Sequence, residues 1–188
     1  MKLDTTHPAP TAHDPGGKVR LWLPADVKGD ASFSDCTRYR TLLRRWRGEA
    51  FPKRFALFIG MNPSTADGEV NDPTVAREWD FAAREGYDAY VKANVGDYRA
   101  THPRDLLADG VIPCSADNIP QIRAQAAKAS LVVMCHGVLN RALVDSGRQM
   151  TALLIEDGVD LWCFGRNADG SPKHPLYLAK TSQLVRYS

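Results

Sequence analysis

An unbroken apolar run, Phe55-Ala56-Leu57-Phe58-Ile59, is the feature that most constrains the fold of this chain. A run without alternating polar residues is typical of a strand buried on both faces of a sheet. The polar loop Gly60-Met61-Asn62-Pro63-Ser64-Thr65-Ala66-Asp67 follows it, and Gly68 and Pro73 delay regular structure further. Open α/β sheets place ligands at the carboxyl ends of their strands. We therefore expect a functional loop here, although a simple turn rich in capping side chains is the alternative.

The alternation of apolar runs and helical patterns continues along the chain. The expected strands are 55–60, 88–94, 131–135 and 160–164, and the expected helices are 73–85, 117–128 and 139–156. Strands that alternate with helices predict a parallel sheet with helices on both faces. The predicted fold class is therefore α/β, a three-layer αβα arrangement with a four-stranded parallel sheet.

The ends of the chain lack this alternation. Val19–Leu23 and Ser32–Trp46 indicate an N-terminal strand or hairpin region, and Gly165–Ser188 reads as an irregular tail. Residues 1–17 contain three prolines and no apolar segment, so we expect a flexible N-terminal arm followed by one catalytic domain at 18–188.

Composition excludes several classes of protein. The 188 residues are 44 % hydrophobic and 24 % charged, as expected for one globular domain. No apolar run approaches the roughly 20 residues of a membrane span, so we expect a cytoplasmic monomer with no membrane partner. The four cysteines form no CxxC pair, and neither a phosphate-binding glycine motif nor a GxSxG elbow occurs. We expect no disulfide, no metal and no cofactor.

Polar residues follow each of the four expected strands. They are Asn62, Ser64, Thr65, Asp67 and Asp72 after the first, Asn94, Tyr98 and Arg99 after the second, His136 after the third, and Lys173 and His174 after the fourth. Because parallel strands end at one edge of the sheet, these residues are expected around one cleft. The alternatives without a functional role are that Asn94 only stabilises its loop and that His174 is a surface residue.

Basic residues are concentrated between Arg38 and Arg54. The segment holds Arg38, Arg40, Arg44, Arg45, Arg47, Lys53 and Arg54 against the single acid Glu49, with Tyr39 and Trp46 interleaved. Clustered arginines and aromatics suit a nucleic-acid backbone. The alternative is a solvated edge strand guarded by charge.

The chain resembles an uncharacterised family of bacterial and phage proteins whose hallmark is an LNPSTAD-type box. The resemblance rests on segments 32–40, 62–67, 71–74, 98–101 and 174–178. It covers nearly everything after residue 30 and implies no established activity.

A more distant resemblance is to the uracil-DNA glycosylase superfamily. Gly60-Met61-Asn62-Pro63 resembles its GINPG water-positioning loop, and Val91–Arg99 with Pro103-Arg104-Asp105 is similar to its NVVKxRPPxxRDP segment. Ala129–Gly137 resembles the PKVIVxLG strand, and His174-Pro175 resembles the HPS motif. The order and spacing of the four agree, which implies the four-stranded fold of that superfamily.

Three features depart from the superfamily pattern. Leu176 replaces the serine after His-Pro, the iron–sulfur cysteines are missing, and the acidic extension from Asp67 to Asp72 has no counterpart. A specialist for ordinary uracil would match more closely, so the expected substrate is a modified or damaged base.

The resemblance implies an enzyme, a DNA glycosylase-like hydrolase that cleaves the N-glycosidic bond of such a base in DNA, in repair, phage defence or phage base modification. Asn62 with Asp67 or Asp72 would hold the attacking water and support the sugar cation, and His174 would donate to the departing base. The other expected contacts are Gly60, Met61, Pro63, Ser64, Thr65, Asn94, Tyr98, Arg99 and His136 with substrate, and Arg38, Arg40, Arg44, Arg45, Arg47 and Lys173 with the DNA backbone. Two alternatives stay open: a nucleosidase or transferase for free nucleosides or nucleotides, and a non-catalytic DNA-binding module that recognises modified bases.

Overall fold

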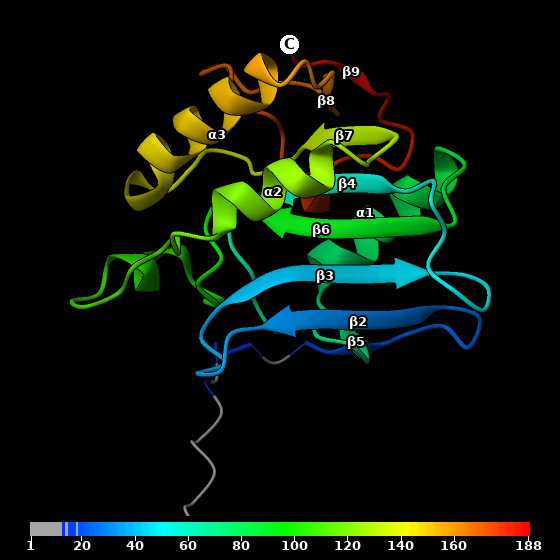
Figure 1. Ribbon diagram of the computed structural model, residues 1–188, viewed down its shortest axis with the longest axis horizontal. Coiled ribbons are helices and arrows are strands. Elements are labelled where there is room, and N and C mark those ends of the chain that lie inside the picture. The colour runs from blue at the N-terminus through cyan, green and yellow to red at the C-terminus, as the bar shows by residue number, and fades with distance from the viewer. Residues whose placement is uncertain (1–12, 14, 18) are drawn as a thin grey trace, which may run out of the picture.

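A seven-stranded mixed sheet forms the centre of the protein, whose computed structural model describes residues 13, 15–17 and 19–188 (Figure 1). In spatial order the strands are β2 (Lys28–Phe33), β3 (Arg40–Trp46), β6 (Ala89–Asn94), β4 (Ala56–Gly60), β7 (Leu131–Met134), β8 (Leu161–Cys163) and β9 (Val185–Arg186). A separate pair joins β1 (Leu21–Trp22) to β5 (Val70–Asn71).

The four central strands β6, β4, β7 and β8 run parallel. All residues of β4 and β6 are buried. The wholly apolar β4 has the composition typical of a strand covered on both faces, whereas β6 also buries the polar side chains of Lys92 and Asn94. Gly60 at the end of β4 pairs in register with Asn94 at the end of β6, so both strands deliver their following loops to the same edge.

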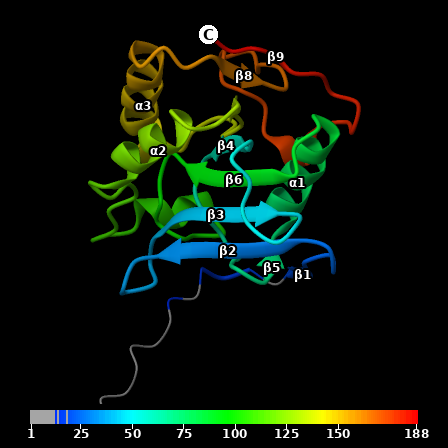
Figure 2. The ribbon, with the colours of Figure 1, turned by 45° about the vertical axis from the view of Figure 1, so that its right-hand side comes forward.

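Helices cover the two faces of this sheet, as Figures 1 and 2 show. Helix α1 (Pro73–Arg84) lies on one face, and α2 (Asn118–Ala126) and α3 (Val144–Glu156) lie on the other. Alternate residues of each strand feed the two hydrophobic cores: Phe58 and Tyr90 pack towards α1, whereas Leu57 and Val91 pack towards α2 and α3. The predicted α/β class is therefore correct, and helices cover both faces of a centre of parallel strands, as expected.

The complete sheet is mixed, which corrects the prediction of a sheet with parallel strands alone. The expected N-terminal hairpin is present as β2–β3, and β3 joins the edge of the central sheet antiparallel to β6. At the other edge β9 pairs antiparallel with β8, within a tail that was expected to be irregular. Both residues of β9 are exposed, so no hydrophobic pattern marks it in the sequence.

Short 3-10 helices account for the remaining differences from the predicted elements. They are η1 (Pro103–Leu107), η2 (Arg141–Leu143), which precedes α3 within the expected long helix, and η3 (Pro175–Tyr177) in the tail. Proline occupies the start of η1 and η3, where its missing N–H has no intrahelical partner to lose.

The predicted flexible arm falls mostly on residues 1–12 and 14, which lie outside the described residues. Its described end contacts the domain: Thr101 N donates to Pro15 O over 3.0 Å, and His13 Nε2 lies 2.8 Å from Arg99 O. None of the helices in the described part of the chain is long and apolar enough to cross a membrane.

Candidate functional site

A cavity of about 470 Å³ opens at the carboxyl ends of β4, β6 and β7, beside the N-terminus of α1. Its volume falls in the range of small-molecule pockets. The wall contains Arg40, Met61, Asn62, Ser64, Asp72, Pro73, Thr74, Val75, Lys92, Asn94, Ala100, Thr101, Pro103, His136, Gly137, Val138, His174, Leu176 and Tyr177. The structure thus brings Asn62, Asn94 and His174 from three separate loops and strands to one cavity.

Hydrogen bonds fix the loop after β4 against the loop after β6. Asn62 Nδ2 donates to Ala100 O over 2.6 Å and to Pro63 O over 3.0 Å, and Ser64 Oγ lies 2.7 Å from Thr101 Oγ1. Both amide hydrogens of Asn62 are therefore engaged. Its Oδ1 atom has no protein partner within the described ranges, which leaves it able to accept a hydrogen bond from a water or a ligand.

Asn94 combines deep burial with a lack of protein partners. The residue is 1 % exposed, and neither Nδ2 nor Oδ1 is hydrogen-bonded to any described residue. Buried polar side chains nearly always have partners, because an unmade bond costs about 1–3 kcal/mol. The side chain that breaks this rule lies in the cavity wall, where a bound molecule can meet both its donor and its acceptor.

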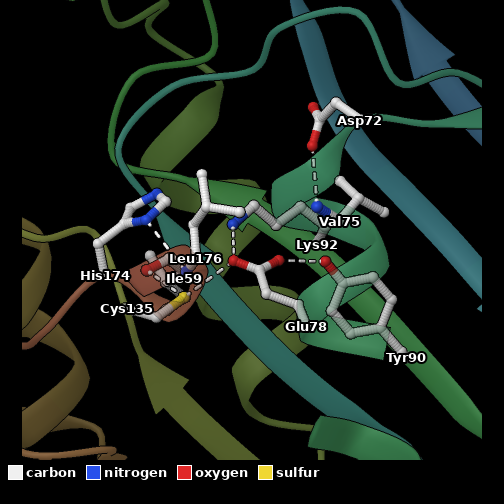
Figure 3. A network of polar contacts seen from close by, with 9 residues as sticks. All are labelled: Ile59, Asp72, Val75, Glu78, Tyr90, Lys92, Cys135, His174 and Leu176. Carbon is white, nitrogen blue, oxygen red and sulfur yellow. Dashed lines mark hydrogen bonds and ion pairs between the residues drawn. The ribbon is translucent and has the colours of Figure 1, made fainter. Parts of the chain in front are cut away.

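A buried ionic network lies beneath the cavity (Figure 3). Lys92 Nζ lies 2.5 Å from Glu78 Oε1, and Tyr90 donates its hydroxyl to the other carboxylate oxygen. Cys135 Sγ donates to Glu78 Oε1 over 3.3 Å. Glu78 comes from α1 and is fully buried, whereas Lys92 also forms part of the cavity wall.

Protonation states in the network follow from its contacts. Burial raises the pKa of Tyr90 well above its usual value, and it does the same to the pKa of Cys135, so both side chains are neutral. Burial opposes the charge of Lys92, but the neighbouring Glu78 carboxylate outweighs it and the pKa of Lys92 is raised. Lys92 is therefore an ammonium that is only 3 % exposed.

Gly60 makes room for the polar groups of β6. A Cβ atom at this position would collide with Lys92 Nζ and would lie 2.9 Å from Asn94 Oδ1. Any larger residue would displace one of the two side chains, so the glycine that ends β4 determines where they lie.

Two histidines of the wall favour their neutral forms. Burial lowers the pKa of both His136 and His174. His136 Nδ1 donates to Gly137 O over 2.6 Å, because a carbonyl only accepts, and Nε2 of the neutral ring is then an acceptor. His174 Nδ1 accepts from Leu176 N over 3.4 Å, so its neutral ring carries the proton on Nε2. The two rings thus offer opposite hydrogen-bonding functions.

The two loop carboxylates occupy different environments. Asp72 lies in the cavity wall and caps α1, accepting from Val75 N over 2.8 Å. Asp67 is outside the wall, and its Oδ1 atom accepts from Glu69 N and Val70 N over 2.9 and 3.0 Å. Asp67 thus stabilises its own turn. Of the two predicted catalytic carboxylates, Asp72 is the one that lies in the cavity wall.

Several predicted substrate contacts do not reach the cavity. Pro63 and Thr65 are buried inside their loop, and Gly60 lies at the strand end below the wall. Tyr98 packs against the rings of His13 and Tyr39. Arg99 lies over the Phe33 ring and donates to Thr37 O over 3.0 Å. The last two side chains are not part of the cavity wall, and their contacts hold the N-terminal segments against the domain.

The predicted arginine stripe is not a continuous surface, because successive residues of β3 face opposite sides of the sheet. Arg45 is fully buried and donates to Asn71, Asp67 O, Val70 O and Arg44 O. Arg40 is 1 % exposed, lies in the cavity wall and donates to Ala66 O. Neither guanidinium is therefore part of an exposed stripe on β3, where the predicted contacts with the DNA backbone would lie.

The other members of the predicted backbone set are at the surface in different settings. Arg44 makes a paired contact with Asp30, and Arg47 pairs with Asp26 while lying 5.0 Å from the Trp79 ring centre. Arg38 and Lys173 are exposed, and Lys173 directly precedes His174 of the cavity wall.

Sequence reasoning missed Lys92, Glu78 and Tyr177. The sequence does contain a signal for Lys92, since it is the one charged residue inside the otherwise uncharged strand Ala89–Asn94. It contains no signal for Glu78, because a glutamate in an amphipathic helix normally faces solvent. No group of three or more His, Cys, Asp or Glu side chains in the described part of the chain is placed to hold a metal ion.

Fold and cavity together define an α/β protein with a cavity at the carboxyl ends of its parallel strands. The chain belongs to the family described as "Protein of unknown function (DUF1643)", which it matches over residues 38–176. Searches of curated proteins and of solved structures gave no match. The matched span includes the whole cavity wall except Tyr177.

Proposed function

We propose that this protein is a DNA glycosylase-like hydrolase that binds a modified or damaged base in the strand-end cavity and cleaves its N-glycosidic bond. The observation that carries the proposal is the Asn94 amide, buried in the wall with donor and acceptor both unpartnered among the described residues. A planar base edge presents complementary donors and acceptors. The type of reaction is proposed from the sequence motifs that resemble those of uracil-DNA glycosylases.

The chemistry needs a positioned water and a stabilised sugar cation. Asn62 Oδ1 is free to accept from a water, while its amide hydrogens keep the side chain fixed. Asp72 supplies a carboxylate to the same cavity, and a nearby negative charge favours the oxocarbenium-like sugar. A neutral amide is a weak base, so this arrangement suits a reaction in which the glycosidic bond breaks before water attacks.

The departing base requires a hydrogen-bond donor. The neutral tautomer of His174 carries its proton on Nε2, and the ring belongs to the cavity wall. Base-removing enzymes take the target nucleotide out of the helix stack into such a pocket. Exposed cations near the opening, Lys173 beside His174 and Arg104 beside Pro103, would contact the phosphates of the flanking strand.

The test is release of a base from DNA. The protein is incubated with single- and double-stranded oligonucleotides that carry a panel of damaged and hypermodified bases. Mass spectrometry identifies free bases, and alkaline cleavage detects abasic sites. Release that Asn94→Ala abolishes supports the proposal. Binding without any abasic site on the whole panel would instead assign a non-catalytic binding module.

A nucleosidase acting on free nucleosides or nucleotides is the second candidate. The burial of Arg45 and Arg40 favours it, because it removes two cations from the basic run that was expected to contact a polyanion. Salt titration separates the two: binding to DNA weakens steeply with salt through counterion release, whereas binding of a single nucleoside does not. Hydrolysis of nucleosides at rates above those for oligonucleotides would select the second candidate.

A further inference from the structure

The Lys92 ammonium is a charged group in the cavity wall that has no part in the proposed reaction. Its side chain is 4 % exposed, yet it belongs to the cavity wall. Of its three N–H bonds, one is directed to Glu78, and no other described residue accepts from it. Buried charges are normally fully paired, so two unused donors at a cavity are a reason to look for an acceptor there.

The carboxylate partner of Lys92 lies on the far side from the cavity. Glu78 is 0 % exposed, is absent from the wall, and accepts from Tyr90, Cys135 and Lys92 together. The hydrogen bonds from the tyrosine and the thiol stabilise its negative charge on that side. A molecule in the cavity therefore contacts the ammonium, which belongs to the wall, and not the carboxylate, which does not. Figure 3 shows how Glu78 lies between Lys92 and Tyr90.

Asn94 lies next to this ammonium, so one bound molecule can contact both side chains. Both side chains leave β6 on the same face of the sheet, two residues apart. They meet above Gly60 of the neighbouring strand, where a Cβ atom would contact both Lys92 Nζ and Asn94 Oδ1. The other cation of the wall, Arg40, has Asp72 as a neighbouring carboxylate. The positive charge beside the unpartnered amide comes from Lys92.

We propose that Lys92 is a further catalytic residue, whose ammonium donates to the oxygen on which the departing base carries negative charge. This assignment rests on the proposed function for its reaction. The bond from C1′ to the base nitrogen breaks, and its electron pair goes to the base. The oxygen of water bonds to C1′, and the proton that water loses ends on the released base. Lys92 lowers the barrier by stabilising the base anion and is itself unchanged.

Free bases test the anion preference without requiring turnover. Calorimetry compares uracil, which is neutral at pH 7.5, with 5-nitrouracil, which is ionised there. A charge-assisted hydrogen bond in a buried site predicts about 10- to 100-fold tighter binding of the ionised base. Inorganic phosphate should not compete, because the acceptor oxygen of Asn94 would face its negative oxygens. Equal binding of the two bases, binding of neither, or competition by phosphate equal to that by 5-nitrouracil would overturn the assignment.

Variants identify the ammonium as the source of the preference. Lys92→Met alone leaves Glu78 buried and unpaired, so Lys92→Met/Glu78→Gln is the variant expected to fold, as a thermal melt checks. It should bind both bases alike. The matched control Tyr90→Phe removes a hydroxyl that bonds to Glu78 but keeps both charges, so it should keep the preference. If the double variant retains the preference, or if Tyr90→Phe abolishes it in a folded protein, Lys92 does not have this role.

Turnover distinguishes a failure of this inference from a failure of the proposed function. In oligonucleotides with a series of 5-substituted uracils, the double variant should lose most rate on poor leaving groups and least on good ones. A purely structural role would lower all rates by the same factor, and that result contradicts the assignment. If wild type releases no base from DNA yet binds the ionised base more tightly, the proposed function fails and the anion site stands.

Discussion

Arg45 Nε lies 2.8 Å from Asn71 Oδ1, so an arginine of the basic segment is bonded to the short strand β5 inside the protein. The other guanidinium nitrogens reach three main-chain carbonyls, of Arg44, Asp67 and Val70. Burial lowers the pKa of Arg45 to about 10, which still leaves it charged at neutral pH. This residue joins the N-terminal hairpin to the loop that carries Asp72 towards the cavity.

Replacing Arg45 should destabilise the fold rather than weaken DNA binding directly. Arg45→Met leaves buried acceptors unpaired, and the free energy of unfolding should fall by about 3 kcal/mol. Urea denaturation followed by circular dichroism measures this. Arg44→Gln is the matched control: its half-exposed contact with Asp30 should contribute less than about 1 kcal/mol. Equal, small losses in both variants would contradict the interior role of Arg45.

Asn94 should stabilise a bound ligand but lower the stability of the ligand-free protein. Asn94→Leu replaces an unpartnered buried amide with an apolar side chain of similar size, so the free energy of unfolding should stay the same or rise by about 1 kcal/mol. Base release should be lost in the same variant. Thermal melts and single-turnover assays on one preparation give both values. A clear loss of stability would show that Asn94 serves only to hold its loop.

Replacing the two loop carboxylates, Asp67 and Asp72, should have different effects on the single-turnover rate. Asp72→Asn keeps a good helix-capping side chain but removes its charge, so the single-turnover rate should fall while the melting temperature changes little. Asp67→Asn should leave the rate unchanged, because its carboxylate bonds to its own turn. Asn62→Ala should lower the rate by about 10²-fold or more with little change in DNA affinity. Unchanged rates in all three variants would remove this loop from the mechanism.

DNA contacts are expected around the opening of the cavity. Lys173→Gln and Arg104→Gln should each reduce the slope of log affinity against log salt by about one, because each removes one phosphate contact. Fluorescence anisotropy over a salt series measures the slope. Arg44→Gln, on the hairpin, should leave it unchanged. A fall with Arg44→Gln alone would instead place DNA along the hairpin.

Stability should decline on the acid side of neutrality because of the buried histidines. Burial lowers the pKa of His136 in the folded protein, so the unfolded chain binds the proton at higher pH. This stabilisation is fully present above the usual histidine value of about 6.5 and is lost as pH falls through the lowered folded pKa. His136→Asn should therefore flatten the dependence of unfolding free energy on pH between about 5 and 7. His102→Gln, at an exposed position, is the control and should not.

The sequence by itself determined the central architecture, because burial on both faces leaves a direct pattern in the residues. The runs at β4 and β7, and the proline and glycine that bound α1, predicted parallel strands with polar loops at one edge. Those loops deliver Asn62, Asn94 and His174 to one cavity, since parallel strands end together.

Only the tertiary structure decided which charges the cavity contains. Alternation along β3 turns Arg45 into the interior, although its neighbours in sequence suggested an exposed stripe. The ion pair of Lys92 with Glu78 joins a strand to a helix. A contact between two separate elements does not follow from any fixed residue spacing, so a single sequence does not predict it. Gly60 shows the same limit: its need for space comes from side chains of the adjacent strand, which only the folded sheet brings beside it.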